Sequence, residues 1–257
     1  MISKRTAIAA LLSLVLALPI ATSAQSSAPA NQKDAKIQQE VDKRIQKSKD
    51  LKNVSATVNN GEVTLNGSVD RLYNKLNLDR KVSGMDGVEG VRNHITVSSS
   101  ASDAQLGKTI ADKLRYDRAG YGLVWNAISL KVQNGIVTLS GLVREPVDKD
   151  SAMAIVENTP GVKGIDDDLE VAPNSPFDDQ IRVAVARAIY GYGPLQRYAL
   201  DPQKPIRIAV ANGHVALYGV VDSKMDSQLA EMRAKSVPNV FSVENHLYVA
   251  NGSNQAK

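Results

Sequence analysis

Histidine and clustered aspartate are the side chains of this chain whose chemistry best suits metal binding or catalysis. The histidines are His94, His214 and His246, and three aspartates are consecutive at 166–168. A zinc site needs about four nitrogen or sulfur ligands, and a calcium site needs oxygen ligands spaced around a loop. The histidines are expected on the polar side of strands and the aspartates in a solvated turn. We therefore expect no metal site, no cofactor and no catalysis, because glycine-rich phosphate loops and Gly-x-Ser-x-Gly motifs are also missing from the sequence.

Aromatic side chains gather in two segments, 116–126 and 190–205, which hold six of the nine Tyr and Trp residues. The six are Tyr116, Tyr121, Trp125, Tyr190, Tyr192 and Tyr198. Tyr and Trp favour places with one apolar and one wet side, including membrane surfaces. Two interpretations remain: the rings contact a membrane or protein partner, or they fill small cores and join neighbouring units. The first interpretation predicts that Trp125 is at least partly exposed.

A basic segment lies near the start of the folded chain. Residues 33–52, KDAKIQQEVDKRIQKSKDLK, hold seven basic and four acidic residues. A basic amphipathic helix can lie on anionic lipid. The candidate lipid contacts are Lys36, Lys43, Arg44 and Lys47. The interspersed acidic residues leave open a solvated, lysine-rich helix face with no ligand.

A twelve-residue pattern, V-x-N-G-x-V-x-L-x-G-x-V, begins at Val58, Val132 and Val210. Asn-Gly indicates a hairpin with a two-residue turn, which requires positive φ at both turn residues. The turn glycines are Gly61, Gly135 and Gly213. A second set falls on the apolar face of each hairpin, where a glycine predicts the close approach of another backbone, expected to be a helix. This set is Gly67, Gly141 and Gly219.

Helical patterns flank each hairpin. Apolar residues recur four apart upstream of it, as at Ile37, Val41 and Ile45. Asp103 and Asp178 stand just before the second and third stripes, where a helix cap or first-turn carboxylate belongs. A second helix and an alternating strand follow each hairpin at a fixed spacing. We therefore predict an α+β chain of three tandem small domains, each helix–strand–strand–helix–strand, with two helices on one face of a three-stranded mixed sheet.

The chain divides into a leader, three repeats and a tail. Residues 1–24 combine Lys4 and Arg5, an apolar run and small residues up to Ala24, which is typical of a secretory signal peptide cleaved after Ala24. The remaining segments are a linker at 25–33, repeat 1 at 34–99, repeat 2 at 102–172, repeat 3 at 176–250 and a tail at 251–257. Cysteine is absent, so disulfides and a lipid-bearing thiol are excluded. These features predict a periplasmic protein that is not a lipoprotein.

The charge balance argues against nucleic acid as a partner. The chain has 31 Lys and Arg against 27 Asp and Glu, a net charge of +4. Two of the cations belong to the predicted signal peptide, so the mature protein is closer to neutral. No strong basic footprint for nucleic acid is present.

The repeated V-x-L-x-G-x-V strand, the helix after it and the closing segment GVEGVRNHITV (87–97) resemble the BON domain, a family named for bacterial osmotic-stress and nodulation proteins. The third copy departs from the pattern at Asn239 and Ser242, where the others have glycine, and the second has Asp167 in place of Asn93. The resemblance implies the fold predicted above, an envelope location, binding to phospholipid membranes and no catalytic residues.

Three functional hypotheses follow. The first is a non-catalytic exported envelope protein that binds anionic phospholipid and supports envelope integrity or stress tolerance. The second is a soluble periplasmic stress protein that binds other envelope proteins, as a chaperone does. The third is a binder of a small molecule or glycan in a cleft between repeats. The oligomeric state and the arrangement of the repeats do not follow from the sequence.

Overall fold

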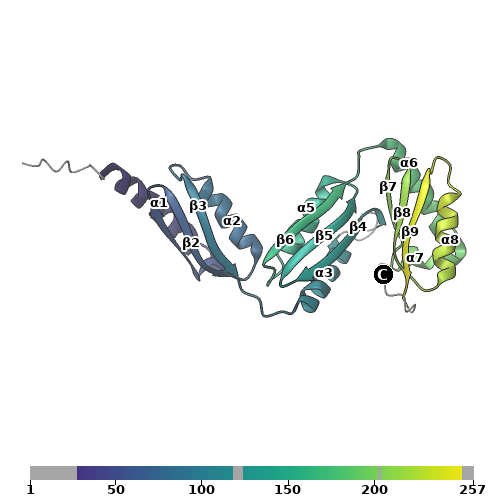
Figure 1. Ribbon diagram of the computed structural model, residues 1–257, viewed down its shortest axis with the longest axis horizontal. Helices are drawn as coiled ribbons and strands as arrows, with labels where there is room; N and C mark the ends of the chain where they lie inside the picture. Colours follow the sequence, from purple (N-terminus) through teal and green to yellow (C-terminus); the bar gives the residue numbers. More distant parts are fainter. Residues whose placement is uncertain (1–27, 118–123, 202–203, 251–257) are drawn as a thin grey trace, which may run out of the picture.

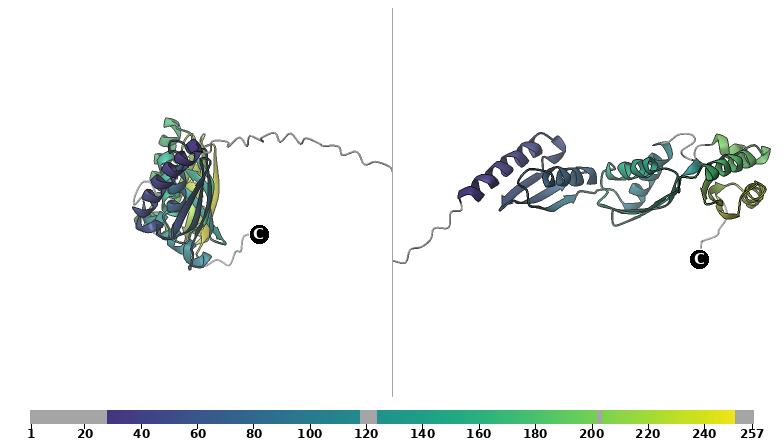
Figure 2. Two further views of the ribbon diagram at one scale, coloured as in Figure 1. Left: turned by 90° about the vertical axis from the view of Figure 1, so that its left-hand side faces the viewer. Right: turned by 90° about the horizontal axis from the view of Figure 1, so that it is seen from above.

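The computed structural model of the chain describes residues 28–117, 124–201 and 204–250. Three repeats follow one another along the long axis of the molecule (Figure 1). In each repeat two helices cover one face of the sheet (Figure 2). The predicted signal peptide and tail lie outside the described residues. No helix within the described ranges is both long and apolar enough to cross a bilayer.

The elements occur in the same order in each repeat. Repeat 1 consists of α1 (Ala28–Gln46), η1 (Lys49–Leu51), β1 (Val54–Asn59), β2 (Glu62–Val69), α2 (Leu72–Ser83) and β3 (Gly90–Val97). Repeat 2 contains α3 (Asp103–Asp117), β4 (Ala127–Gln133), β5 (Ile136–Val143), α5 (Pro146–Glu157) and β6 (Gly164–Val171). Repeat 3 consists of α6 (Pro176–Tyr190), η2 (Gly193–Leu195), α7 (Arg197–Leu200), β7 (Arg207–Ala211), β8 (His214–Val221), α8 (Lys224–Lys235) and β9 (Ser242–Val249).

Each sheet is mixed, with the middle strand of the sequence also in the middle of the sheet. The first two strands pair antiparallel, and the third pairs parallel with the second after the helical crossover. The register places Val58 opposite Val63, and the corresponding valines are paired in the other two hairpins. The predicted α+β class and the order of elements are confirmed.

The core of each repeat lies between its helices and its sheet. Ile37, Val41 and Ile45 of α1 are buried, as are Val63 and Leu65 of β2. The four-residue spacing puts the helix residues on one stripe, and the alternation of the strand puts its apolar residues on the facing side. The sequence pattern therefore builds the core of each repeat directly.

The hairpin turns have the predicted geometry. Gly61, Gly135 and Gly213 have φ of 77°, 80° and 78°. The asparagine before each glycine also has positive φ, at 50°, 54° and 52°. Both turn residues are thus left-handed, as a type I′ turn requires.

The second set of glycines makes a different contact from the one predicted. A Cβ added to Gly67 or Gly141 would lie 2.0 Å from a backbone carbonyl oxygen, that of Asn53 or Ala127. At Gly219 the corresponding distance, to the carbonyl oxygen of Pro205, is 2.6 Å. The backbone that approaches belongs to the entry of the hairpin's first strand, so the expectation of a helix there is wrong. The glycines also have positive φ, between 115° and 133°, which a side chain would strain.

Neighbouring repeats are in contact. The Gly161 N–H of repeat 2 donates to the Asp70 carbonyl of repeat 1 at 2.9 Å. Repeats 2 and 3 are joined by Trp125, which packs into the apolar cluster of repeat 3, and by an ion pair of 3.3 Å between Arg144 and Asp179. The three repeats are therefore docked end to end.

Candidate functional site

One carboxylate in each repeat holds the first helix against the hairpin turn. Asp34 accepts hydrogen bonds from the backbone N–H groups of Asn60 and Gly61 at 2.7 and 2.8 Å. Asp103 and Asp178 make the same pair of bonds to their own Asn-Gly turns, at 2.7 to 2.9 Å. Each aspartate lies three residues before the first apolar residue of its helix stripe. This shared spacing is the sequence signal for a contact that the capping interpretation of Asp103 and Asp178 missed.

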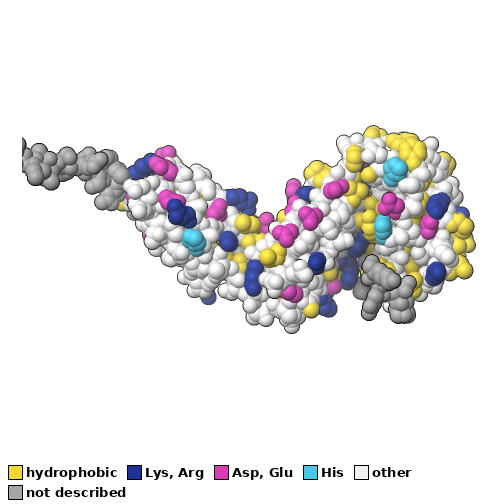
Figure 3. Space-filling view, in the orientation of Figure 1, with side chains coloured by type: hydrophobic (Ala, Val, Ile, Leu, Met, Phe, Trp, Pro, Cys, Tyr) yellow, Lys and Arg dark blue, Asp and Glu magenta, His cyan; other side chains and the backbone are white. Residues whose placement is uncertain are grey.

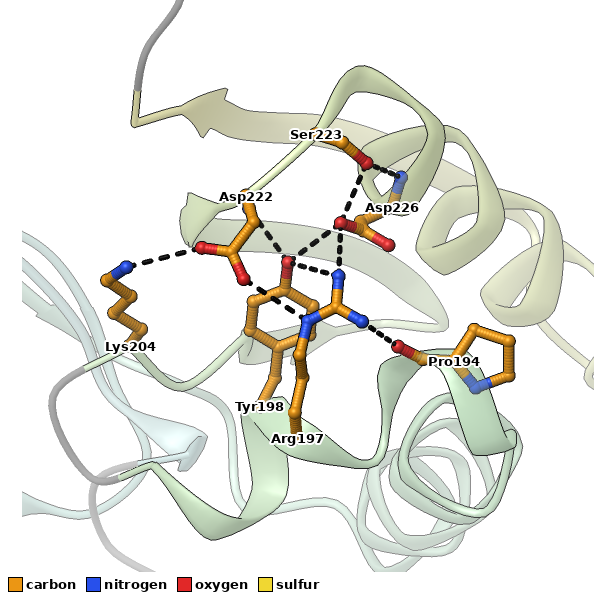
Figure 4. A network of polar contacts seen from close by, with 7 residues as sticks. All are labelled: Pro194, Arg197, Tyr198, Lys204, Asp222, Ser223 and Asp226. Atoms are coloured by element: carbon orange, nitrogen blue, oxygen red, sulfur yellow. Dashed lines mark hydrogen bonds and ion pairs between the residues drawn. The ribbon is translucent and has the colours of Figure 1, made fainter.

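The aromatic segment of repeat 3 is fixed by a polar network (Figure 4). Tyr198 is 2% exposed, and its hydroxyl donates to Asp226 Oδ2 at 2.9 Å while accepting from the Asp222 N–H at 2.8 Å. The Arg197 guanidinium bonds to Asp226 Oδ2 at 2.6 Å and lies over the Tyr198 ring. Burial raises the pKa of the Tyr198 hydroxyl. Tyr198 is therefore a neutral, fully bonded residue that fixes α7 to the start of α8.

Asp222 extends this network to a second cation, Lys204. Lys204 and Arg197 each lie 3.2 Å from a carboxylate oxygen of Asp222. The hydrogen bond from Lys204, followed by the charges of Lys204 and Arg197, lowers the pKa of Asp222. Ser223 caps α8 by accepting from the Asp226 N–H at 3.1 Å. These bonds form a structural clasp that holds the segment before β7 to the start of α8.

Trp125 is buried, so the prediction of partial exposure is wrong. Its side chain is 5% exposed and packs in the apolar cluster of repeat 3, which includes Ile189 and Leu195. The sequence could show that this residue belongs to an insertion of repeat 2, but not that the insertion reaches into the next repeat. Trp125 fills a core across a repeat boundary instead of contacting solvent.

The remaining aromatic candidates are divided between interior and surface. The Tyr190 hydroxyl donates to the Ile206 carbonyl oxygen, and burial raises its pKa. Tyr192 is half-buried under the Arg233 guanidinium, whose carbon is 5.1 Å from the ring centre. Tyr116 is 58% exposed at the end of α3. Tyr121 lies outside the described residues. The aromatic candidates therefore do not form one surface, and packing accounts for most of them.

The basic residues of α1 line a groove between α1 and α2. The groove has a volume of ≈ 580 Å³. Lys43 and Arg44 come from the last turn of α1, Lys47 directly follows that helix, and Lys81 comes from α2. The floor includes the buried Leu51 and Leu78 of repeat 1, and the acidic lining residue is Glu40.

These four cations have no counter-ion among the residues that the structure describes. Among the described residues, no hydrogen bond or ion pair involves the side chain of Lys43, Arg44, Lys47 or Lys81. Lys36, the fourth predicted lipid contact, is also exposed on α1 but does not line the groove. Both helices end near the groove, so the negative ends of their dipoles reinforce the placement of cations there.

The cationic groove is specific to repeat 1. With the aspartate anchors and the loop glycines aligned, its four positions are Asp112, Lys113, Tyr116 and Ile155 in repeat 2, and Arg187, Ala188, Gly191 and Arg233 in repeat 3. Arg233 is used internally, since its guanidinium donates to the Ala188 carbonyl at 2.9 Å. The shared fold therefore does not require the cations of repeat 1.

The histidines lie apart from one another on the sheets. His214 is 2.8 Å from Ser242 Oγ, and His246 stacks on Tyr218 with ring centres 4.8 Å apart. Across the described ranges, no group of three or more His, Asp or Glu side chains is placed to hold a metal ion.

A row of three small α+β modules in contact with one another defines a tandem-domain protein. A family model described as BON domain matches residues 33–99, 102–173 and 178–251, and the chain belongs to this family. It is 30% identical over 131 residues to Osmotically-inducible protein Y of Escherichia coli (strain K12). That match covers 47% of this chain and 60% of the relative, which is less than two thirds of the relative's length.

Two solved structures of CdsD, a structural protein of the type III secretion system of Chlamydia trachomatis, were also similar. Both are 17% identical to this chain, with a TM-score of 0.22. The C-terminal-domain structure covers 82% of this chain and 95% of its own, and the other covers 83% and 92%. This TM-score is too low to support a common arrangement of the repeats.

Proposed function

We propose that the protein is an exported, non-catalytic component of the bacterial envelope that binds anionic phospholipid through repeat 1. The observation that carries the proposal is the groove between α1 and α2, where Lys43, Arg44, Lys47 and Lys81 have no counter-ion among the described residues. Membership of the BON family and the likeness to an osmotically inducible protein support a role in envelope stress. The signal peptide at 1–24, cleaved after Ala24, would deliver the mature chain to the periplasm.

The charges of the groove suit a phosphate-bearing surface. Lipid phosphates accept hydrogen bonds from ammonium and guanidinium groups, and each Lys or Arg near an anionic bilayer contributes about 1 kcal/mol. Lys36 lies on the same helix and adds to the long-range attraction. Because the groups are exposed, the attraction is screened by salt. The attachment is therefore reversible and depends on ionic strength.

Co-sedimentation of the mature protein with vesicles tests this proposal. We expect binding to phosphatidylcholine vesicles that contain phosphatidylglycerol, weak binding to phosphatidylcholine alone, and release at high salt. The double variant Lys43→Glu with Lys47→Glu is expected to lose most of the binding, because two attractive charges become repulsive.

A matched control is available in repeat 2. Lys131→Glu with Lys163→Glu makes the same change in net charge at two exposed lysines that form no ion pair within the described residues. This control is expected to retain binding. Equal losses in the two double variants, or binding that ignores lipid charge, would contradict a site in the α1–α2 groove.

A second candidate function is the binding of other envelope proteins. Large apolar side chains are exposed on repeat 3, namely Leu200, Met225, Met232 and Phe241. Exposed apolar groups of this kind are used in protein contacts. Contacts made by them are expected to resist salt, so retention of a partner at high ionic strength favours this function over lipid binding.

A further inference from the structure

A groove between repeats 2 and 3 combines cations with aromatic rings. Its volume is ≈ 440 Å³, within the range of small-molecule sites. Repeat 2 contributes the end of α3, including Arg115, and the edge strand β4. Repeat 3 contributes Lys204, Arg207 and the outer face of its sheet, and two carboxylates of repeat 2, Asp117 and Asp148, also line the groove. Figure 3 shows basic and apolar side chains at this junction.

The sheet wall of the groove is a row of three paired residues. Arg207 of β7 is opposite Tyr218 of β8, which is opposite His246 of β9. The Tyr218 and His246 rings are stacked at an angle of 13°. Tyr248, two residues beyond His246 on the same face, also lines the groove and is 63% exposed. The wall thus presents flat rings beside a guanidinium group.

Arg207 is a half-buried cation without a counter-ion. Its side chain forms no hydrogen bond or ion pair with any residue of the described ranges. Arg115 and Lys204 are both paired, with Asp112 at 3.1 Å and Asp222 at 3.2 Å respectively. Burial, and secondarily the like charge of Arg115, lower the pKa of Arg207. An arginine remains charged under these conditions, so an anion in the groove would relieve both costs.

The other repeats show that the fold does not need this row. The positions of Arg207, Tyr218 and His246 are Ser55, Asn66 and His94 in repeat 1, and Ser129, Ser140 and Asp168 in repeat 2. Repeats 1 and 2 keep polar residues on this sheet face but have neither the arginine nor the tyrosine. The arginine and tyrosine occur only where a second repeat closes the hollow.

We propose that this groove binds a phosphate monoester carried on a sugar- or polyol-sized skeleton. The phosphate would accept from the Arg207 fork, with Arg115 and Lys204 adding charge, and the skeleton would lie against Tyr218 and Tyr248. Three cations line the hollow against the two carboxylates Asp117 and Asp148, and Arg207 is the cation left for the three acceptor oxygens of a phosphate. The site is independent of lipid binding by repeat 1.

The probe is glycerol 1-phosphate, titrated into the mature chain by calorimetry and by backbone amide NMR, with glycerol as the neutral comparison. We expect saturable binding with shifts at Arg207, Tyr218 and His246. Arg207→Gln should weaken binding by about tenfold or more, because a charge-assisted bond is lost. Arg207→Lys, which keeps the charge without the fork, should recover part of the loss.

Arg92→Gln, at an exposed arginine on β3, is the matched control and should bind as the wild type does. Circular dichroism melts of each variant separate a loss of binding from a loss of fold. Vesicles that contain phosphatidic acid, a lipid with a phosphate monoester headgroup, identify the source of the phosphate: reduced vesicle binding by Arg207→Gln points to a lipid headgroup, and unchanged vesicle binding to a soluble ester. No saturable binding of glycerol 1-phosphate, or equal weakening in Arg92→Gln, overturns the proposal. Vesicle binding by the Lys43 and Lys47 double variant tests the groove of repeat 1 and does not affect this conclusion.

Discussion

Repeats 1 and 3 share a fold but use their cations in opposite ways. In repeat 1, Lys43 and Lys47 project into a groove without partners. In repeat 3, Arg182 is buried and donates to the Val210 carbonyl at 2.6 Å, and Arg197 is bonded to Asp226. A cation that satisfies a backbone carbonyl or a buried carboxylate stabilises the fold and is no longer available to a ligand. Arg182 and Arg197 therefore support the fold of repeat 3, where Arg207 is a cation that lacks such a bond among the described residues.

The chain between the first helix and the hairpin differs in the same direction. From Ile45 to Gly61 there are 16 positions, and from Ile189 to Gly213 there are 24. Repeat 1 crosses this distance with the three residues of η1, whereas repeat 3 adds η2 and α7, which are clasped to α8. The added residues increase the core of repeat 3 and provide a hollow for Trp125 of repeat 2. The longer segment of repeat 3 therefore helps to join repeats 2 and 3.

The largest expected effect is that of removing the side chain that joins repeats 2 and 3. Trp125→Ala should destabilise this pair by about 3–5 kcal/mol, because a buried aromatic is lost from a core. Urea unfolding followed by circular dichroism measures it, since Trp125 is the only tryptophan of the chain. Tyr116→Ala, at an exposed ring of the same segment, should change stability by less than about 0.5 kcal/mol. Similar effects for the two variants would mean that the junction is not held by Trp125.

The aspartate anchors of repeats 1 and 3 should contribute different amounts to the free energy of unfolding. Asp178 is fully buried and Asp34 is partly exposed, although each accepts the same two N–H groups. Asp178→Ala should cost about 3 kcal/mol because the freed donors are cut off from water, and Asp34→Ala about 1 kcal/mol because water replaces the carboxylate. Urea unfolding of both variants checks the ratio. Equal costs would show that burial does not distinguish the anchors.

The smallest expected effect is a pH dependence of the stability that Asp222 contributes. The pKa of Asp222 lies below its ordinary value of 3.8, so its carboxylate favours the folded state. That contribution is complete above about pH 3.8 and is lost as the pH falls through the lower folded-state value. Asp222→Asn should therefore be less stable than the wild type at neutral pH, by less than about 1 kcal/mol since the pair is half-exposed, and the difference should close in acid.

Asp70→Asn is the control for this prediction. Asp70 occupies the same position in repeat 1, and no ion pair within the described residues involves its carboxylate. Denaturant melts at neutral and acidic pH should show no comparable difference for it. If the difference in unfolding free energy between wild type and Asp222→Asn stays constant in acid, the Asp222 carboxylate does not stabilise the fold through its ion pairs.

The hairpins and helix stripes could be predicted because their signals are local. Asn60-Gly61 sets the turn, and with it the pairing of Val58 with Val63. The contact of Gly67 with the Asn53 carbonyl could not be predicted, since a pattern shows that space is needed but not which backbone takes it. The sequence singled out the basic residues Lys43, Arg44 and Lys47 but did not predict a groove, because Lys81 comes from a helix distant in sequence.

Asp167 shows how a departure from the repeat is absorbed. In repeat 1, Asn93 donates to Asp79 Oδ1 at 3.0 Å, whereas in repeat 2 Asp167 pairs with Lys149 at 2.8 Å. Although burial acts to raise it, bonds from Lys149 and from the Leu169 N–H hold the pKa of Asp167 below its ordinary value. The second helix is thus tied to the last strand in both repeats by reversed donors and acceptors. The exchange is visible only when both elements are seen together.

The aspartate anchors also bear on the chemical lifetime of the chain. Asn-Gly sequences are prone to deamidation, in which the glycine nitrogen attacks the asparagine side chain and a succinimide forms. In all three turns that nitrogen donates to an aspartate oxygen at 2.8 Å, so it is held away from the attack while the repeat is folded. Deamidation at Asn60, Asn134 or Asn212 therefore requires the repeat that holds it to open. The fraction of each asparagine that has deamidated then reports how often that repeat unfolds.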